Sequence, residues 1–272
     1  MNDWVEYGDG VFVRHHLSLS LNIGVVDCGE AMLLVDTRGS HRQARQLKAA
    51  IARLSPLPVR WVVNTHHHWD HTFGNAEFLP APIWGHERCA SRLADEGRLT
   101  LDRLRLAYGE SAGPELDEVA ITPPDHTFTD SVTIECGSRR FDLLHPGPGH
   151  TDNDVVLVVD GGEVVFAGDL IEESGPPAYD DAYPLEWPAA AARLLGLIAG
   201  SVVPGHGRVV DRDFVATQAG DIAEVARLAS ARHAEGMPEG EAARAGGPFP
   251  PETMAAAFRR AWEHLDRGDR PW

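Results

Sequence analysis

Short alternating runs of hydrophobic residues open the chain and predict β-strands. Residues 11–13, 23–27 and 31–36 are apolar and are separated by glycine or polar turns. The period then changes, because apolar residues after Ser40 recur at spacings of three and four. This predicts a helix that begins at Ser40 as N-cap and ends before Pro56. The apolar strand RWVVNT follows, and a strand, a helix and a strand in succession are typical of a mixed α/β layer fold.

The rest of the chain alternates between helical and strand-like patterns. The predicted elements are amphipathic helices over 87–109, 188–199 and 213–234, strands within 127–166, and an irregular proline-rich segment over 172–188. Residues 236–251 have the glycine and proline content of a linker, and a final amphipathic helix follows them. We therefore predict a main domain over residues 1–235 and a linker with a C-terminal helix over 236–272.

The final helix, over about residues 251–267, carries an apolar stripe. Its members are Met254, Phe258, Ala261, Trp262 and Leu265. Such a stripe is covered either by the helix's own domain or by a second subunit. Both arrangements stay open, so a homodimer is one expectation.

The charge of the chain narrows the class of partner. Its 272 residues include 24 lysines and arginines against 41 aspartates and glutamates, a formal net charge of −17. This charge repels nucleic acid and anionic membranes at long range, and no apolar run approaches the roughly 20 residues that span a membrane. We expect a small-molecule substrate, and neither a nucleic acid nor a membrane as partner.

The three cysteines, Cys28, Cys89 and Cys136, lie far apart and show no paired spacing. This pattern predicts free buried thiols in a reducing compartment. The N-terminal segment MNDWVEYGDG is acidic and has no apolar stretch of the kind found in a secretory signal. Both observations predict a cytoplasmic protein.

A run of metal-ligand residue types directly follows the strand RWVVNT. It reads His66-His67-His68-Trp69-Asp70-His71. Alternate residues that leave a strand point the same way, so His66 and His68 are placed to bind one ion. Asp70 and His71 come one turn later and are placed to face a second ion. Imidazole nitrogen and carboxylate oxygen are ligands that zinc accepts, so the segment predicts a metal site.

Three further candidates follow apolar strands later in the chain. His150 lies in HPGPGHTDND, Asp169 ends EVVFAGD, and His206 lies in VVPGHG. Each lies in or beside a glycine-containing turn, where backbone approaches a ligand closely. Sites in open α/β sheets lie beyond the carboxyl ends of strands, so we expect these residues to converge with the histidine run.

Together these motifs resemble the metallo-β-lactamase-fold hydrolase superfamily, in order and over about residues 10–235. The resemblance implies a four-layer αββα sandwich as the catalytic domain, 1–235, with a C-terminal helical extension. It also implies two metal ions, one held by three histidines and one by Asp70 and two histidines, with Asp169 bridging both. The implied ligands are His66, His68 and His150 for the first ion, and Asp70, His71 and His206 for the second.

A hydrolytic mechanism follows from this ligand set. Two zinc ions, two carboxylates and a bridging hydroxide leave the site with about one positive charge, which suits an electron-rich carbonyl or ester oxygen. We expect the metal-bridging hydroxide to attack a small ester, lactone, thioester or amide, while Asp70 orients it or moves its proton. Imidazole and carboxylate ligands also suit iron or manganese in place of zinc.

Departures from known branches refine the resemblance. Asp169 stands where many true β-lactamases have Cys or Ser, and where glyoxalase-II-like and lactonase-like members have the bridging aspartate. THHHWDH resembles glyoxalase II, but ESGPPAYDDAYPLEW replaces that branch's segment after the aspartate. Antibiotic hydrolysis therefore becomes a secondary expectation, a weak β-lactamase.

Two alternatives of other classes stay open. A mononuclear iron-dependent sulfur (persulfide) oxygenase needs only two histidines and one carboxylate, and the apparently complete seven-ligand set argues against it. A non-catalytic binding module predicts a broken ligand set, and the sequence has none.

The proline-rich segment supplies aromatic residues near the expected site. Tyr179, Tyr183 and Trp187 either line the substrate pocket or pack the loop onto the sheet, and both interpretations stay open. Among the other histidines, His67 points away from the metals by strand alternation and is predicted to be structural. His86 and His145 are candidates for hydrogen bonds to the ligands.

Overall fold

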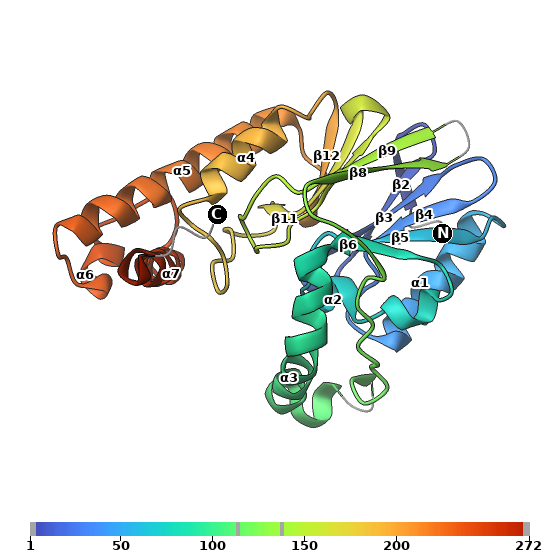
Figure 1. Cartoon of the computed structure of the whole chain (residues 1–272), viewed down its shortest axis with the longest axis horizontal. Helices are drawn as coiled ribbons and strands as arrows, with labels where there is room; N and C mark the ends of the chain where they lie inside the picture. Colours follow the sequence, from blue (N-terminus) through green and yellow to red (C-terminus); the bar gives the residue numbers. More distant parts are fainter. Residues whose placement is uncertain (1–3, 113–114, 137–138, 269–272) are drawn as a thin grey trace.

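The strands form one continuous hydrogen-bonded path in the computed structural model, which describes residues 4–112, 115–136 and 139–268 (Figure 1). The order is β7-β6-β5-β4-β3-β12-β11-β10-β9-β8, and β1 joins through β2 to β3. The strands are β1 Trp4–Gly8, β2 Val11–His16, β3 Leu21–Asp27, β4 Met32–Val35, β5 Val59–Val63, β6 Ile83–His86, β7 His126–Phe128, β8 Ser131–Cys136, β9 Arg139–Leu144, β10 Val156–Val159, β11 Val164–Glu172 and β12 Ser201–His206.

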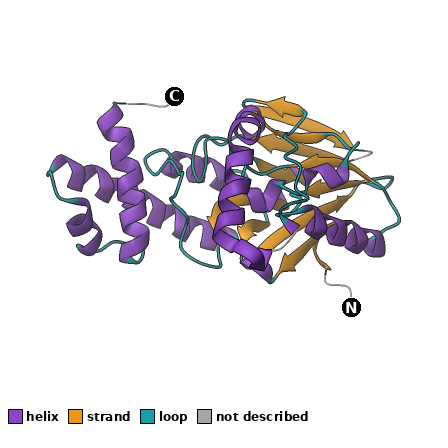
Figure 2. Ribbon diagram, turned by 90° about the horizontal axis from the view of Figure 1, so that it is seen from below, coloured by secondary structure: helices purple, strands orange, loops and turns teal. Residues whose placement is uncertain are grey.

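Helices lie along both outer faces of this sheet system, and the last two helices of the chain lie beyond its edge (Figures 1 and 2). They are α1 His41–Leu54, α2 Trp69–Thr72, α3 Glu87–Ala112, α4 Trp187–Leu195, α5 Arg212–Ala234, α6 Glu239–Arg244 and α7 Pro251–Arg267. The predicted helix after Ser40 is confirmed, because the Ser40 side chain accepts from the backbone N–H of Gln43 and caps α1.

Side-chain alternation along the strands creates the layers. On β11, Val164 and Phe166 belong to the apolar core between the two halves of the sheet, whereas Val165 and Ala167 pack towards α4 and α5. On β4, Leu33 faces the central core and Leu34 faces α1. Helix, sheet, sheet and helix therefore stack as the predicted four-layer sandwich.

The C-terminal part of the chain differs from the prediction at one point. The segment 236–251, predicted as a linker, contains the short helix α6, whose Ala242 and Ala243 are buried. The prolines and the other glycines flank this helix, Gly240 lies within its first turn, and its alanines join the same core as α5 and α7. Most of the stripe of α7 is covered in cis, because Met254, Phe258 and Ala261 are fully buried within the chain, whereas Leu265 is 37% exposed.

The cysteine prediction is wrong for two of the three residues. Cys28, after β3, and Cys136, at the end of β8, form a disulfide with their Cα atoms 5.6 Å apart. The bond joins the two halves of the sandwich, which brings together residues separated by 108 positions. Cys89 is a free buried thiol, as predicted. The expectation of a reducing compartment therefore loses its support from the cysteines.

The length and the hydrophobicity of a helix decide whether it can span a membrane. Among residues 4–112, 115–136 and 139–268, no helix combines the length and the apolar character needed to cross a bilayer.

Candidate metal centre

The histidine run lies where β5 ends and α2 begins. β5 is parallel to both of its neighbours, β4 and β6, and the chain leaves it into a short loop that carries His66 and His68. Asp70 and His71 then fall in the first turn of α2 and are buried. The local sequence thus delivers four ligand-type side chains from one strand end.

The other three candidates come from the opposite half of the sandwich. His150 lies in the loop between β9 and β10, Asp169 lies within β11, and His206 ends β12. β11 and β12 run parallel, so Asp169 and His206 reach the same edge of the sheet. Gly205 makes this approach feasible, because a Cβ atom on it would lie only 1.7 Å from Asp169 Oδ1.

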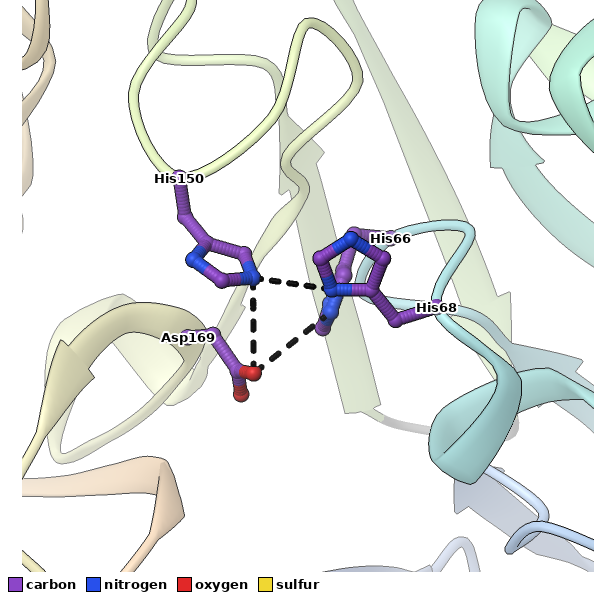
Figure 3. A group of neighbouring side chains, drawn as sticks. All are labelled: His66, His68, His150 and Asp169. Carbon is purple, nitrogen blue, oxygen red and sulfur yellow. Dashed lines mark hydrogen bonds and ion pairs between the residues drawn. The ribbon is translucent and has the colours of Figure 1, made fainter. Parts of the chain in front are cut away.

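One group consists of three histidines and the Asp169 carboxylate, which point towards one another in Figure 3. His150 Nε2 lies 2.9 Å from His68 Nδ1. Asp169 Oδ2 lies 3.6 Å from His66 Nε2 and 3.5 Å from His150 Nε2. Four potential ligand atoms therefore surround one point.

A second group lies on the other side of Asp169 and consists of Asp70, His71 and His206. The Nε2 atoms of the two histidines are 3.3 Å apart, and Asp70 Oδ2 lies 3.4 Å from that of His206. Asp169 faces this group as well, with Oδ1 3.4 Å from His71 Nε2 and Oδ2 3.3 Å from His206 Nε2. The structure therefore brings all seven predicted residues together, with Asp169 between the groups.

Unsatisfied polar atoms test whether this cluster fits metal ions. His66 Nε2 and Asp169 Oδ1 are buried without a hydrogen-bond partner, although buried polar atoms are otherwise paired almost without exception. His71 and His206 each donate from Nδ1, so in the neutral rings their two Nε2 atoms, 3.3 Å apart, both face each other as acceptors. Cations on these atoms satisfy the unpaired lone pairs, so the residues fit the implied ions.

The electrostatics of the cluster divide its histidines. In His68 and His206 burial lowers the pKa, but the Asp181 carboxylate beside His68 and the Asp169 carboxylate beside His206 outweigh it and raise each pKa to about 9. Burial lowers the pKa of His66 far below its usual value and that of His150 to about 4, so both rings are neutral at neutral pH. Burial raises the pKa of Asp169, but the neighbouring His71 and His206 outweigh it and hold that pKa far below its usual range. The shared carboxylate is therefore ionised.

Two carboxylates that the sequence analysis missed orient the ligands. Asp36 Oδ2 accepts from His71 Nδ1 at 2.8 Å, which turns His71 Nε2 towards Asp169. Asp181 lies 3.0 Å from His68 Nε2, which leaves His68 Nδ1 for the first group. Asp36 follows the strand β4 directly, a signal that the sequence did offer. Asp181 lies in an irregular loop and offered none.

The other histidines lie outside both groups. His67 Nδ1 accepts from Asn153 Nδ2 at 2.9 Å, in agreement with a structural role. His86 and His145 pack on each other with ring centroids 4.3 Å apart. His145 Nδ1 donates to the backbone oxygen of Asp154, so neither ring has a described hydrogen bond to a ligand.

The loop aromatics are mostly core residues. Tyr179 is 1% exposed and Trp187 is fully buried, and their rings pack 5.2 Å apart within the core beneath α4. Packing of the loop onto the sheet is therefore the interpretation that fits these two. Tyr183 is half-buried, and its hydroxyl lies 3.4 Å from Asp152 Oδ2.

Known proteins are similar to this chain in sequence and fold. The sequence model of the metallo-beta-lactamase superfamily matches residues 19–214. A linear primary-alkylsulfatase from Pseudomonas sp. is 24% identical over 68% of this chain and 41% of its own length. The alpha subunit of a 2,4-dinitroanisole O-demethylase from Nocardioides sp. is 28% identical over 76% of this chain and 56% of its own.

A solved structure supports the same fold. A metallo-beta-lactamase from Pontibacter korlensis superposes with a TM-score of 0.65 and 22% identity, over 81% of this chain and 98% of that one. The chain spans only about half the length of the two curated relatives. The match of the superfamily model nevertheless extends over most of the chain, from the turn before β3 to the start of α5. This chain belongs to the metallo-beta-lactamase superfamily.

Proposed function

We propose that the protein is a dinuclear metal-dependent hydrolase of a small ester, lactone, thioester or amide. The position of Asp169 carries the proposal, because its carboxylate lies within 3.3–3.6 Å of nitrogens in both ligand groups. One carboxylate shared by two sets of three ligands is an arrangement for two cations. A mononuclear iron oxygenase needs only two histidines and one carboxylate, and it leaves the second group without a role.

The chain's residues divide the work at this site. His66, His68 and His150 hold one ion and the second group holds the other; nitrogen and oxygen ligands suit zinc, and also iron or manganese. When bound, two such cations lower the pKa of a coordinated water to about 7 and polarise a substrate carbonyl. Asp70, 8% exposed beside His206, orients the attacking water and accepts its proton.

Membership of the superfamily does not identify the substrate. The two relatives are named for an alkylsulfatase and an O-demethylase, and the structural neighbour for a β-lactamase. Asp169 in the shared position favours ester, lactone or thioester cleavage over antibiotic cleavage, so weak β-lactamase activity is the secondary proposal. The proposed partner is a small-molecule substrate. Its identity does not follow from the fold, since one fold hosts many different reactions.

Elemental analysis of the purified protein, together with hydrolysis of a lactone, a thioester and a cephalosporin, tests the proposal. We expect about two zinc ions per chain and turnover of at least one substrate. His66→Ala and Asp70→Ala lose one ion and the turnover, whereas His126→Ala, on an exposed residue, keeps both. One iron per chain with no hydrolysis refutes the proposal.

A further inference from the structure

Arg38, in the loop between β4 and α1, is a buried guanidinium without a carboxylate partner. It is 7% exposed, and in the described part of the chain no carboxylate lies within ion-pair distance of it. Arginine is rarely buried unless it is paired, because an unpaired charge is costly to remove from water. The charge of Glu115 raises the pKa of Arg38, but that carboxylate already accepts from the Ser40 hydroxyl and lies 3.5 Å from Arg42 Nη1. The charge of Arg38 therefore has no adjacent counter-charge.

One edge of the Arg38 guanidinium makes no hydrogen bond to any described residue. On the other edge, Nη1 donates to Nδ1 of His16, the last residue of β2. Nε is buried without a partner, and Nη2 beside it has none among the described residues either. A guanidinium carries five donors and no acceptor, so only an acceptor satisfies this edge. Nε and Nη2 direct two parallel N–H groups outward, which is the arrangement that binds both oxygens of a carboxylate or a similar oxyanion.

His16 adds a second buried donor to the same region. Because its Nδ1 accepts from Arg38, the hydrogen of the neutral ring is on Nε2, and Nε2 is buried without a partner. Burial, with Arg38 and Arg14 beside it, lowers the pKa of His16 to about 3, so the ring is neutral at neutral pH. Burial and then Arg14 lower the pKa of Arg38 to about 10, which leaves it charged. Donors and positive charge thus gather here in a chain whose formal net charge is −17.

The backbone of Arg38 is consistent with a binding role. Its φ is 73°, in the left-handed region that glycine adopts freely and other residues adopt at a cost. Glycine at this position would remove both the backbone strain and the unpaired buried charge, so the fold alone does not account for an arginine here. Strained residues of this kind concentrate at sites that bind ligands or carry out chemistry.

The loop that carries Arg38 lies beside the second ligand group without belonging to it. The N–H of Thr37 donates to the backbone oxygen of His71 at 2.8 Å. On the other side, β2 leads into the turn whose Leu19 carbonyl accepts from His206 Nδ1 at 2.7 Å. Arg38 itself is in neither ligand group. An anion at Arg38 is therefore near the metal centre but is not held by its ligands, and an experiment has to separate the two positions.

We propose that Arg38 is the centre of a binding site for a small oxyanion of carboxylate size, which pairs with its Nε–Nη2 edge. His16 fixes the guanidinium in place by accepting from Nη1 on the opposite edge. Bidentate pairing supplies both the counter-charge and the acceptors that the buried edge needs. The inference does not rest on the proposed hydrolase function, because none of these atoms belongs to a ligand group.

Urea unfolding of the metal-loaded protein in sodium acetate and in sodium chloride, at equal ionic strength, tests the site. An anion that binds only the folded chain stabilises it by mass action, so we expect about 200 mM acetate to lower the unfolding equilibrium constant at least about fivefold relative to chloride. Arg38→Gly removes the paired donors and suits the left-handed backbone, so it should fold and lose this difference. Arg38→Lys keeps the charge without the paired donors and should show a smaller difference than wild type.

The comparison between proteins removes other effects of acetate. Acetate at the metal ions and general salt effects act on wild type and Arg38→Gly alike, so only the difference between the two reports on Arg38. Arg53→Ala, at an exposed arginine of α1, is the matched control and should respond as wild type. Equal responses of wild type and Arg38→Gly overturn the inference, and so does a wild type that responds to none of acetate, formate, nitrate and sulfate.

A crystal structure of the protein in acetate gives the position of the anion. We expect two oxygens at about 2.7–2.9 Å from Nε and Nη2 of Arg38. Acetate found only at the metal ligands contradicts the inference. Neither measurement depends on turnover, so failure of the hydrolase proposal and failure of this site are separate results.

Discussion

Arg260 on α7 donates from Nε to the backbone oxygen of Ala182 at 3.0 Å, and its Nη2 lies 3.4 Å from that of Asp181. The guanidinium also lies over the Tyr183 ring, 5.7 Å from its centroid. The carboxylate of Asp181 faces His68 Nε2. The matched family region ends at residue 214, so a helix beyond it supports a residue that orients a proposed metal ligand.

Removing this support should weaken the metal site. We expect Arg260→Ala to speed metal loss to a chelator by about three- to tenfold. This effect is smaller than the roughly 10- to 100-fold loss of metal affinity that follows when the direct partner of a ligand is removed. Arg260→Lys keeps the charge but not the planar guanidinium, so its rate of metal loss should lie between those of wild type and Arg260→Ala. Stopped-flow chelator competition measures the rates. The exposed neighbour in Arg259→Ala is the matched control and should behave as wild type.

A larger effect is expected at Asp36, which contacts His71 directly. Both of its oxygens are used, since Oδ1 accepts from the N–H of Thr65 and Oδ2 from the Thr65 hydroxyl, each at 2.8 Å. Asp36→Asn places an NH2 group against one of these donors, so metal affinity should fall by about 10- to 100-fold. Titration with a competing chromophoric chelator measures the affinity. Asp142→Asn, on the surface of β9, should have no effect, and equal affinity in both variants contradicts the assigned role.

The sequence was sufficient for the parts of the site that are local. Four ligand-type residues stand within six positions after a strand, so strand alternation alone separates His66 and His68 from His67. The helix after Ser40 was equally local, because capping and period both lie in one segment. The prediction that strand ends converge followed from how sheets are built, and it placed His150, Asp169 and His206 near the run.

The remaining features depend on contacts that no local pattern encodes. Asp181 reaches His68 across 113 positions, and Cys28 meets Cys136 only because the two halves of the sheet close on each other. Tyr179 lies in a proline-rich loop and Trp187 where that loop enters α4, and composition does not say whether such a segment turns inward. In each case, tertiary packing decided the outcome.

The disulfide makes stability sensitive to reducing agents. Cys28 and Cys136 are both nearly inaccessible, at 5% and 1% exposed, and the bond closes a long loop. Reduction should lower the free energy of unfolding by roughly 2–5 kcal/mol, as loss of a native disulfide commonly does. Urea unfolding with and without dithiothreitol measures this difference. The variant with both residues changed to serine should not respond to the reductant, while Cys89→Ser should still respond; a wild type that does not respond contradicts the bond.

The stability of the fold should also fall in mild acid because of His86. This residue is 4% exposed, and burial, with His145 beside it, lowers its pKa to about 4. Between pH 6.5 and 4 the unfolded chain binds a proton at this ring that the folded chain does not, so stability decreases as pH falls through this range. The contribution is at most about 3 kcal/mol from a shift of this size.

His86→Asn tests this directly, because the amide oxygen replaces the ring nitrogen that accepts from the N–H of Arg88 and does not titrate. We expect the variant to lose less stability than wild type between pH 7 and pH 4.5, in urea unfolding with excess chelator so that metal release adds nothing to the slope. His126→Asn, at an exposed position, should keep the wild-type slope. If the free energy of unfolding depends on pH equally in wild type and His86→Asn, other groups cause the acid sensitivity. The pKa of His86 is then the same in the folded and the unfolded chain, and the prediction is wrong.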